Sequence, residues 1–158
     1  MDDPSICGRS DVRNLVVCWH LADWRFYMAS IHKEVAVRAR PEDVWAAVRD
    51  VGAVHTRLVP GLLVDARLEG DARVVTWANG MVLRELIVDI DDVAMRLAYA
   101  AVGGRTTHHN SSMQVFDDIE GSRLVWITDL LPNELAGFVA GLVEQGAAAI
   151  KQTLEAGG

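Results

Sequence analysis

The last part of the chain reads as one long amphipathic helix that follows a run of short strand-like segments. Asn133 is suited to cap a helix that begins at Glu134 and continues to about Leu154. A long helix after a series of antiparallel strands must lay its apolar stripe on one face of the sheet. If the sheet curls around the helix, a hollow opens between them, and such a hollow can hold a small apolar ligand.

The segments before this helix alternate between apolar and polar residues and are separated by turn residues. Asn79-Gly80 is the strongest two-residue hairpin signal among the turns. Pro41 opens a short helix that ends at Gly52, and a second short helix covers residues 53–58. The fold class expected is α+β, with a curved antiparallel sheet of about seven strands wrapped around the C-terminal helix and two short helices after strand 1. The expected strands cover residues 31–39, 62–69, 73–78, 81–90, 95–102, 107–116 and 123–131.

Composition and charge exclude several classes of partner. The length of 158 residues suits one domain, and a hydrophobic content of 51% excludes disorder for most of it. The net charge is −7 and no basic run occurs, so neither nucleic acid nor an anionic membrane surface is an expected partner. No segment is long and apolar enough for stable membrane insertion. The cysteines, Cys7 and Cys18, form no metal-binding spacing, and a cytoplasmic location is expected.

The N-terminal region differs from the rest of the chain. We expect residues 1–29 to be an extension that is disordered or loosely packed, and residues 30–156 to form the ligand-binding domain. Met28 resembles a natural start, and the apolar run 15–19 is interrupted by charges on both sides. The rival interpretation is that residues 15–27 form an amphipathic segment whose aromatic side chains dock on the domain.

The order of elements, together with three groups of residues, resembles the START-like or SRPBCC superfamily, which includes the polyketide cyclase/dehydrase and lipid transport family. These groups are the Pro41-Glu42-Asp43-Val44-Trp45 run, the Arg73 to Tyr99 region with Asn79-Gly80 and Glu85-Leu86, and the Gly121, Trp126 and Pro132 spacing. The resemblance covers about residues 31–155 and implies the helix-grip fold. It leaves function open, because the superfamily includes binders, carriers, cyclases and subunits of larger enzymes. The chain departs from many bacterial members at residues 54–60, where Pro60 is present but the Trp of a Trp-x-Pro element is not.

The segment 107–116 has the clearest alternation. One face of this strand is a row of polar side chains, formed by His108, Asn110, Ser112 and Gln114. This row should face water, which places His109 and Ser111 inside the grip. A histidine and a hydroxyl on an inner face are candidates for ligand contact. The alternative is a histidine satisfied by a backbone carbonyl or lying at a wet pocket mouth.

Two carboxylates are candidates for acid–base chemistry together with His109. The resemblance implies that Glu85 is a cavity carboxylate, where burial would favour its protonated form and suit proton transfer; the alternative is a surface ion pair with an arginine of a neighbouring strand. Alignment on Pro132 places Val125, Ile127 and Asp129 inside, so that Glu85, His109 and Asp129 would converge. In the other phase Trp126 is an inner aromatic wall and Asp129 is solvated.

The last helix contributes a further set of candidates. Gly137 and Gly141 lie on one face, and interior helical glycines are unfavourable unless they permit a close approach to the sheet or to a ligand. The alternative is plain helix–sheet packing. The residues expected to contact ligand are Trp45, His55, Leu58, Trp77, Leu83, Tyr99, Ser111, Met113, Ile127, Phe138, Gly141, Leu142 and Gln145.

The leading functional hypothesis is a domain that binds a small hydrophobic molecule, of polyketide, aromatic or lipid type. The alternative is a cyclase or dehydratase that uses Glu85, His109 and Asp129 as acid–base groups. A third hypothesis is an interaction module with a filled cavity. No metal is expected, because His108 and His109 point to opposite faces of a strand, and no cofactor is expected, because the chain has no phosphate-binding loop. The expected assembly is a monomer or a homodimer.

Overall fold

The computed structural model describes residues 28–157 and shows an antiparallel sheet folded around one long helix. The expectations for residues 1–27 therefore lie outside the described residues. The helices are α1 (Pro41–Val48), α2 (Val54–Arg57), a 3-10 turn η2 (Asn133–Leu135) and α3 (Ala136–Ala156). The strands are β1 (Ala29–Val37), β2 (Leu63–Glu69), β3 (Ala72–Trp77), β4 (Val82–Asp91), β5 (Arg96–Val102), β6 (His108–Asp118) and β7 (Gly121–Leu131).

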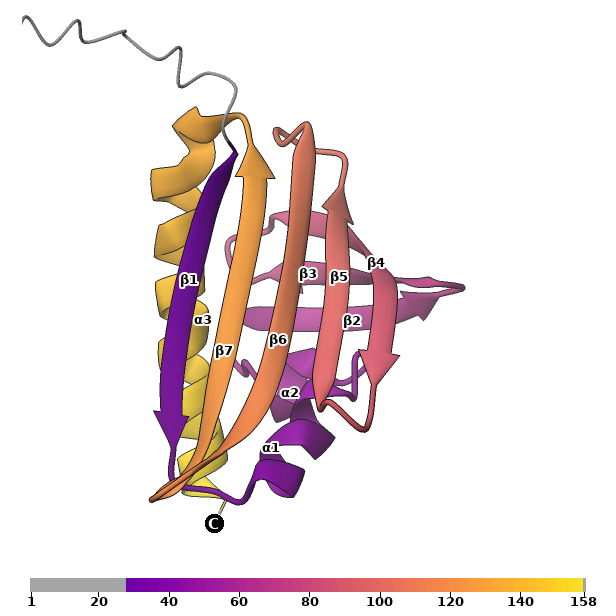
Figure 1. Ribbon diagram of the computed structural model, residues 1–158. Helices are drawn as coiled ribbons and strands as arrows, with labels where there is room; N and C mark the ends of the chain where they lie inside the picture. The colour runs from indigo at the N-terminus through magenta and orange to yellow at the C-terminus, as the bar shows by residue number, and fades with distance from the viewer. Residues whose placement is uncertain (1–27, 158) are drawn as a thin grey trace, which may run out of the picture.

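The helix-grip fold and its α+β class are confirmed. The seven strands form one sheet in the order β1-β7-β6-β5-β4-β3-β2, so the chain's first strand pairs with its last. The sheet bends until β2 and β3 run across the direction of β1 and β7, and α3 lies in the resulting concave side (Figure 1). Helices α1 and α2 lie at one end of this concave side, and the β5–β6 loop lies at the opposite end (Figure 1).

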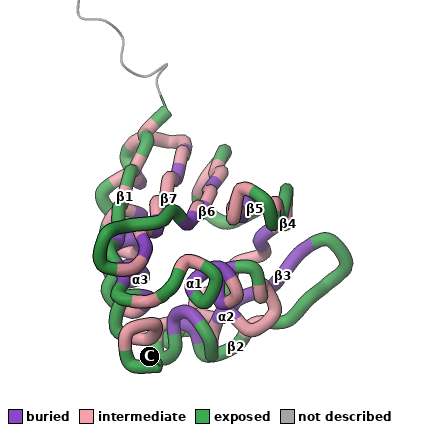
Figure 2. Tube along the Cα trace, turned by 60° about the horizontal axis from the view of Figure 1, so that its bottom comes forward, coloured by how far each residue is buried: buried purple, intermediate pink, exposed green. Residues whose placement is uncertain are grey.

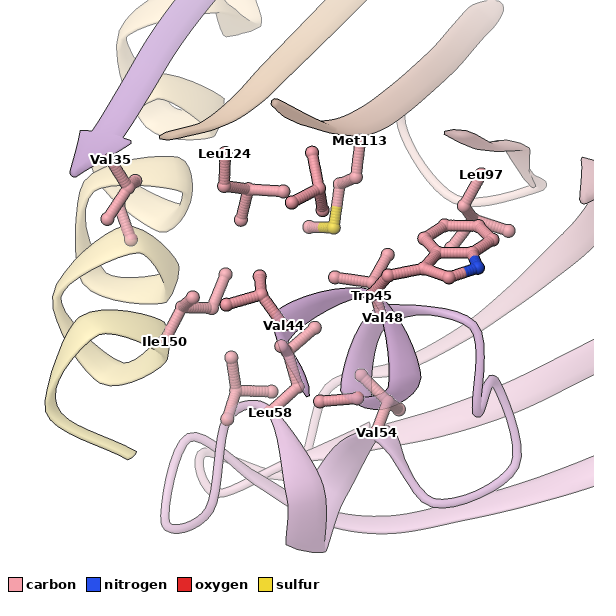
Figure 3. Close-up of a cluster of buried hydrophobic side chains, with 14 of the residues drawn as sticks. Val35, Val44, Trp45, Val48, Val54, Leu58, Leu97, Met113, Leu124 and Ile150 are labelled. Atoms are coloured by element: carbon pink, nitrogen blue, oxygen red, sulfur yellow. The ribbon is translucent and has the colours of Figure 1, made fainter. Parts of the chain in front are cut away.

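The end of the grip beside α1 and α2 is filled by a packed core. Val44 and Trp45 of α1 and Leu58, which directly follows α2, meet Leu124 of the sheet and Ile150 of α3 (Figure 3). Burial is concentrated where the helices face the sheet, while the tip of the β2–β3 hairpin is exposed (Figure 2). Apolar side chains in a core of this kind pack to crystal-like density.

One glycine of α3 permits the helix to approach the sheet closely, and it differs from the two that the spacing indicated. A Cβ on Gly146 would lie 2.7 Å from Cζ3 of Trp126, which is shorter than a normal contact. Nothing lies within 4 Å of a Cβ on Gly137 or Gly141, and both residues are exposed. The prediction of a close approach at Gly137 and Gly141 is therefore wrong, because that face of α3 is turned to solvent.

Candidate functional site

A cavity of about 300 Å³ lies between the first half of α3 and the concave face of the sheet. This volume is at the lower end of the range for small-molecule pockets. Its exposed lining residues lie at the start of β4, in the β5–β6 loop and, for Phe138, on α3, and these three segments border its mouth. The lining consists of Trp77, Met81, Val82, Leu83, Glu85, Tyr99, Ala101, Gly103, Gly104, Arg105, Thr106, His109, Ser111, Trp126, Thr128, Leu135, Phe138, Val139, Leu142 and Val143.

Glu85 is the buried charge in this lining, and its partner comes from the neighbouring strand. Glu85 on β4 stands directly opposite Arg73 on β3, and Arg73 Nε donates to Glu85 Oε2 at 2.6 Å. The guanidinium also lies 5.0 Å from the centre of the Tyr99 ring, within range of a cation–π contact. Glu85 thus lies in the cavity wall, as the resemblance implies, and its ion pair is buried rather than on the surface.

A row of hydroxyl groups crosses the inner face of β5, β6 and β7. The register places Tyr99 beside Ser111 and Ser111 beside Thr128. The Ser111 and Thr128 hydroxyls are 2.7 Å apart, so one donates to the other. Burial raises the pKa of Tyr99 well above its usual value, and the nearby Glu85 carboxylate adds to this effect while Arg73 opposes it. The row therefore presents neutral hydroxyls to the cavity.

His109 lies in the cavity wall near the start of β6. Its Nδ1 accepts a hydrogen bond of 3.3 Å from the backbone N–H of Ala101, so the neutral ring carries its proton on Nε2. Burial lowers the pKa of His109, while the Glu85 carboxylate acts in the opposite direction. His109 is accordingly suited to act as a neutral ring that donates a hydrogen bond from Nε2 at neutral pH.

Two indole N–H groups are further donors in the cavity wall. Trp77 Nε1 is buried and has no hydrogen-bond partner among residues 28–157, whereas the Trp126 indole lies near the Tyr99 hydroxyl, which can accept from it. A buried donor without a partner is unfavourable. The polar groups of the cavity are thus mainly donors and hydroxyls set into an apolar surface.

Six of the residues predicted to contact ligand line the cavity, and so do Glu85 and His109, two of the acid–base candidates. The six residues come from β3 to β6 and from the first half of α3, and they are Trp77, Leu83, Tyr99, Ser111, Phe138 and Leu142.

The other predicted site residues lie outside the cavity wall. Trp45, Leu58 and Met113 belong to the packed core at the α1 and α2 end (Figure 3), and His55 lies on α2 at the same end. Gly141 and Gln145 lie on the exposed side of α3.

Ile127 and Asp129 lie outside the cavity because the side chains of β7 alternate in the opposite phase to the one predicted from the alignment on Pro132. The register pairs Thr128 with Ser111 and Trp126 with Met113, all of which point inward. Alternation therefore turns Ile127 and Asp129 to the outer face. The predicted convergence of Glu85, His109 and Asp129 is wrong, because only the first two share the cavity.

The residues that the sequence did not single out belong mostly to the mouth and to α3. Gly103 and Gly104 mark a turn in the sequence, and nothing in a turn signal shows that it borders a cavity. Trp126 was recognised as an inner aromatic wall only in the alternative phase of its strand. The complete set is Met81, Val82, Ala101, Gly103, Gly104, Arg105, Thr106, Trp126, Thr128, Leu135, Val139 and Val143.

The described part of the chain offers no metal cluster and no helix that could span a membrane. Among residues 28–157, no three His, Cys, Asp or Glu side chains are grouped to hold a metal ion. Within the same residues, no helix has the length and apolar character needed to cross a bilayer.

Comparison with known proteins agrees with this architecture. The family model described as "Polyketide cyclase / dehydrase and lipid transport" matches residues 28–156. A search of curated proteins finds no match.

Several solved structures share the fold. An uncharacterized protein from Bacillus thuringiensis superposes with a TM-score of 0.73 at 18% identity, covering 80% of this chain and 98% of its own. A norcoclaurine synthase point mutant from Thalictrum flavum, in complex with a transition-state analogue, has a TM-score of 0.63 at 21% identity, covering 83% of this chain and 97% of its own. Ara h 8.0201 has a TM-score of 0.66 at 16% identity, covering 82% of this chain and 99% of its own. At such identities the similarity shows the fold alone.

Proposed function

We propose that this chain, which belongs to the polyketide cyclase/dehydrase and lipid transport family, binds a small hydrophobic molecule in the cavity between its sheet and α3. The observation that carries the proposal is the cavity itself, about 300 Å³ in volume and walled chiefly by apolar side chains. Moving an apolar ligand from water into such a wall is favourable by about 25 cal/mol for each Å² buried. The packed core at the α1 and α2 end supports the rest of the grip and confines the ligand to the end near the β5–β6 loop.

The cavity also supplies the groups that would orient such a ligand. His109 offers an N–H donor, and the Ser111–Thr128 pair offers a hydroxyl. Ligand pockets commonly combine an apolar wall with a few polar groups that fix orientation. A ligand with one oxygen acceptor on an apolar body would fit this combination.

The second candidate function is acid–base catalysis in the same cavity. It is favoured by the presence of both Glu85 and His109 in one wall. It ranks below binding because Glu85 is engaged by Arg73 and Asp129 faces the other side of the sheet. The third hypothesis, a filled cavity, is the weakest, since the cavity is open. A cytoplasmic location and a monomeric or homodimeric state stay predictions from the sequence.

Titration with N-phenyl-1-naphthylamine, a neutral dye that fluoresces in apolar surroundings, tests the binding proposal. Ala101 lies in the cavity wall, so Ala101→Phe should fill part of the cavity and weaken dye binding by about tenfold or more. Ala100, the next residue of β5, points to the opposite face, and Ala100→Phe is the matched control. Equal dye affinity in folded wild type, Ala101→Phe and Ala100→Phe would overturn the proposal.

Native mass spectrometry of the freshly purified protein gives an independent reading. A bound small molecule should appear as an added mass on the wild type and be reduced in Ala101→Phe. Its mass would also identify the class of ligand.

A further inference from the structure

Arg105 is the cation without an ion-pair partner in the described chain. Among residues 28–157, every other Lys and Arg has a carboxylate oxygen within 4.0 Å. The protein carries 22 acidic residues against 15 basic ones, so a cation without an acidic neighbour is unexpected. Arg105 is exposed and follows Gly103-Gly104 in the β5–β6 loop.

This arginine borders the cavity described above. Arg105 and Thr106 line the mouth, while the wall below them is largely apolar. The other charged or titratable side chains in the lining are Glu85, Tyr99 and His109. Glu85 is neutralised by Arg73 at 2.6 Å, so no free carboxylate in the wall competes for Arg105 or repels an incoming anion.

We propose that the ligand is an amphipathic acid, whose apolar body fills the cavity and whose carboxylate pairs with Arg105 at the mouth. This inference rests on the proposed binding function and names the ligand class for the same site. An arginine can hold a carboxylate by two parallel N–H···O bonds, which a neutral oxygen cannot match. The same geometry keeps the charged group of the ligand in contact with water, so its desolvation is small.

The test uses two dyes with the same ring skeleton. N-phenyl-1-naphthylamine is neutral, and 1-anilinonaphthalene-8-sulfonate adds one anionic group that stands for the carboxylate. Arg105→Gln should weaken binding of the sulfonate dye by about three- to tenfold, since ion pairs near the surface are modest in strength, and should leave the neutral dye unchanged. Decanoate and 1-decanol, as competitors of the neutral dye, should show the same selective loss for the acid.

Two control variants separate a local contact from a general charge effect. Arg105→Lys keeps the charge and should retain most of the preference for the acid. Arg40→Gln removes the same charge at the start of α1, where Arg40 pairs with Asp43, and should leave both dyes unaffected.

The two proposals fail in different ways. Absence of binding for the neutral dye would overturn the proposed function. Binding of both dyes with no selective effect of Arg105→Gln, or an equal effect of Arg40→Gln, would overturn the assignment of Arg105 alone and leave a pocket for neutral ligands.

Discussion

Arg73 Nε lies 2.6 Å from Glu85 Oε2, and both side chains are almost fully buried at the border between the cavity and the packed core. The guanidinium also reaches towards the backbone oxygen of Val51, at 3.5 Å, in the connection between α1 and α2. This one arginine therefore contacts the cavity wall, the Tyr99 ring and the helical end of the grip. A buried charge pair in such a position should matter for both stability and pocket shape.

Loss of one member of this pair should be strongly destabilising. Arg73→Met leaves the Glu85 carboxylate buried without its partner, and we expect the free energy of unfolding to fall by about 3 kcal/mol. Replacement of both residues, Arg73→Met with Glu85→Leu, should recover much of this loss because no uncompensated charge remains. Urea unfolding measures both effects.

The Arg84–Glu69 pair provides the matched control in the same part of the sheet. The two side chains are 2.7 Å apart, but each is 41% exposed. Arg84→Met should therefore cost less than about 1 kcal/mol. A loss for Arg73→Met no greater than that for Arg84→Met would contradict the assigned role of the buried pair.

The lowered pKa of His109 predicts a pH dependence of stability. Burial lowers the folded-state pKa, so the unfolded chain binds a proton more readily, starting near the ordinary value of about 6.5. Its contribution to stability is therefore present above this pH and is lost as the pH falls towards the folded-state pKa. Chemical unfolding at pH 8 and pH 5 should show a smaller loss of stability on acidification in His109→Gln than in the wild type.

The adjacent residue provides the control for this experiment. His108 is exposed on the opposite face of β6, so His108→Gln should keep the wild-type difference between pH 8 and pH 5. If His108→Gln reduced that difference as much as His109→Gln, the histidine responsible would not be the one in the cavity wall.

The glycines of α3 should respond in opposite directions to the same substitution. Gly141 is exposed with no atom near its Cβ position, so Gly141→Ala should stabilise the protein by up to about 1 kcal/mol through helix propensity. At Gly146 a Cβ would meet the Trp126 ring at 2.7 Å, and Gly146→Ala should destabilise by about 1 kcal/mol. Because Trp126 lines the cavity, its displacement should also weaken binding of the neutral dye. Thermal unfolding of the two variants would show shifts of the same sign if Gly146 had no packing role.

The N-terminal extension remains a prediction. A chain that begins at Met28 should unfold within a few degrees of the full-length protein, because the sequence indicates that the domain starts there. Calorimetry of the two chains measures the difference. A large decrease in the unfolding temperature would indicate that Trp19, Trp24 and Phe26 contribute to the core.

The sequence by itself determined the order of elements and the phase of β6. The strands alternate, Asn79-Gly80 marks a hairpin, and a long apolar stripe in α3 must face the sheet, so the helix-grip fold could be predicted from local patterns. The row of polar residues from His108 to Gln114 has one acceptable orientation, since the opposite one would bury two amides, a hydroxyl and an imidazole. His109 and Ser111 were therefore placed inside correctly.

Tertiary structure alone decided the phase of β7 and the place of the cavity. Both faces of residues 123–131 carry apolar side chains, so alternation allows either, and only the pairing of Thr128 with Ser111 turns Trp126 inward and Asp129 outward. The cavity lies at the β5–β6 end because α1 and α2 bring Val44, Trp45 and Leu58 together at the other end and fill it. Whether a hollow is filled depends on the packing of side chains that are far apart in the chain, and a pattern of neighbouring residues does not contain that information.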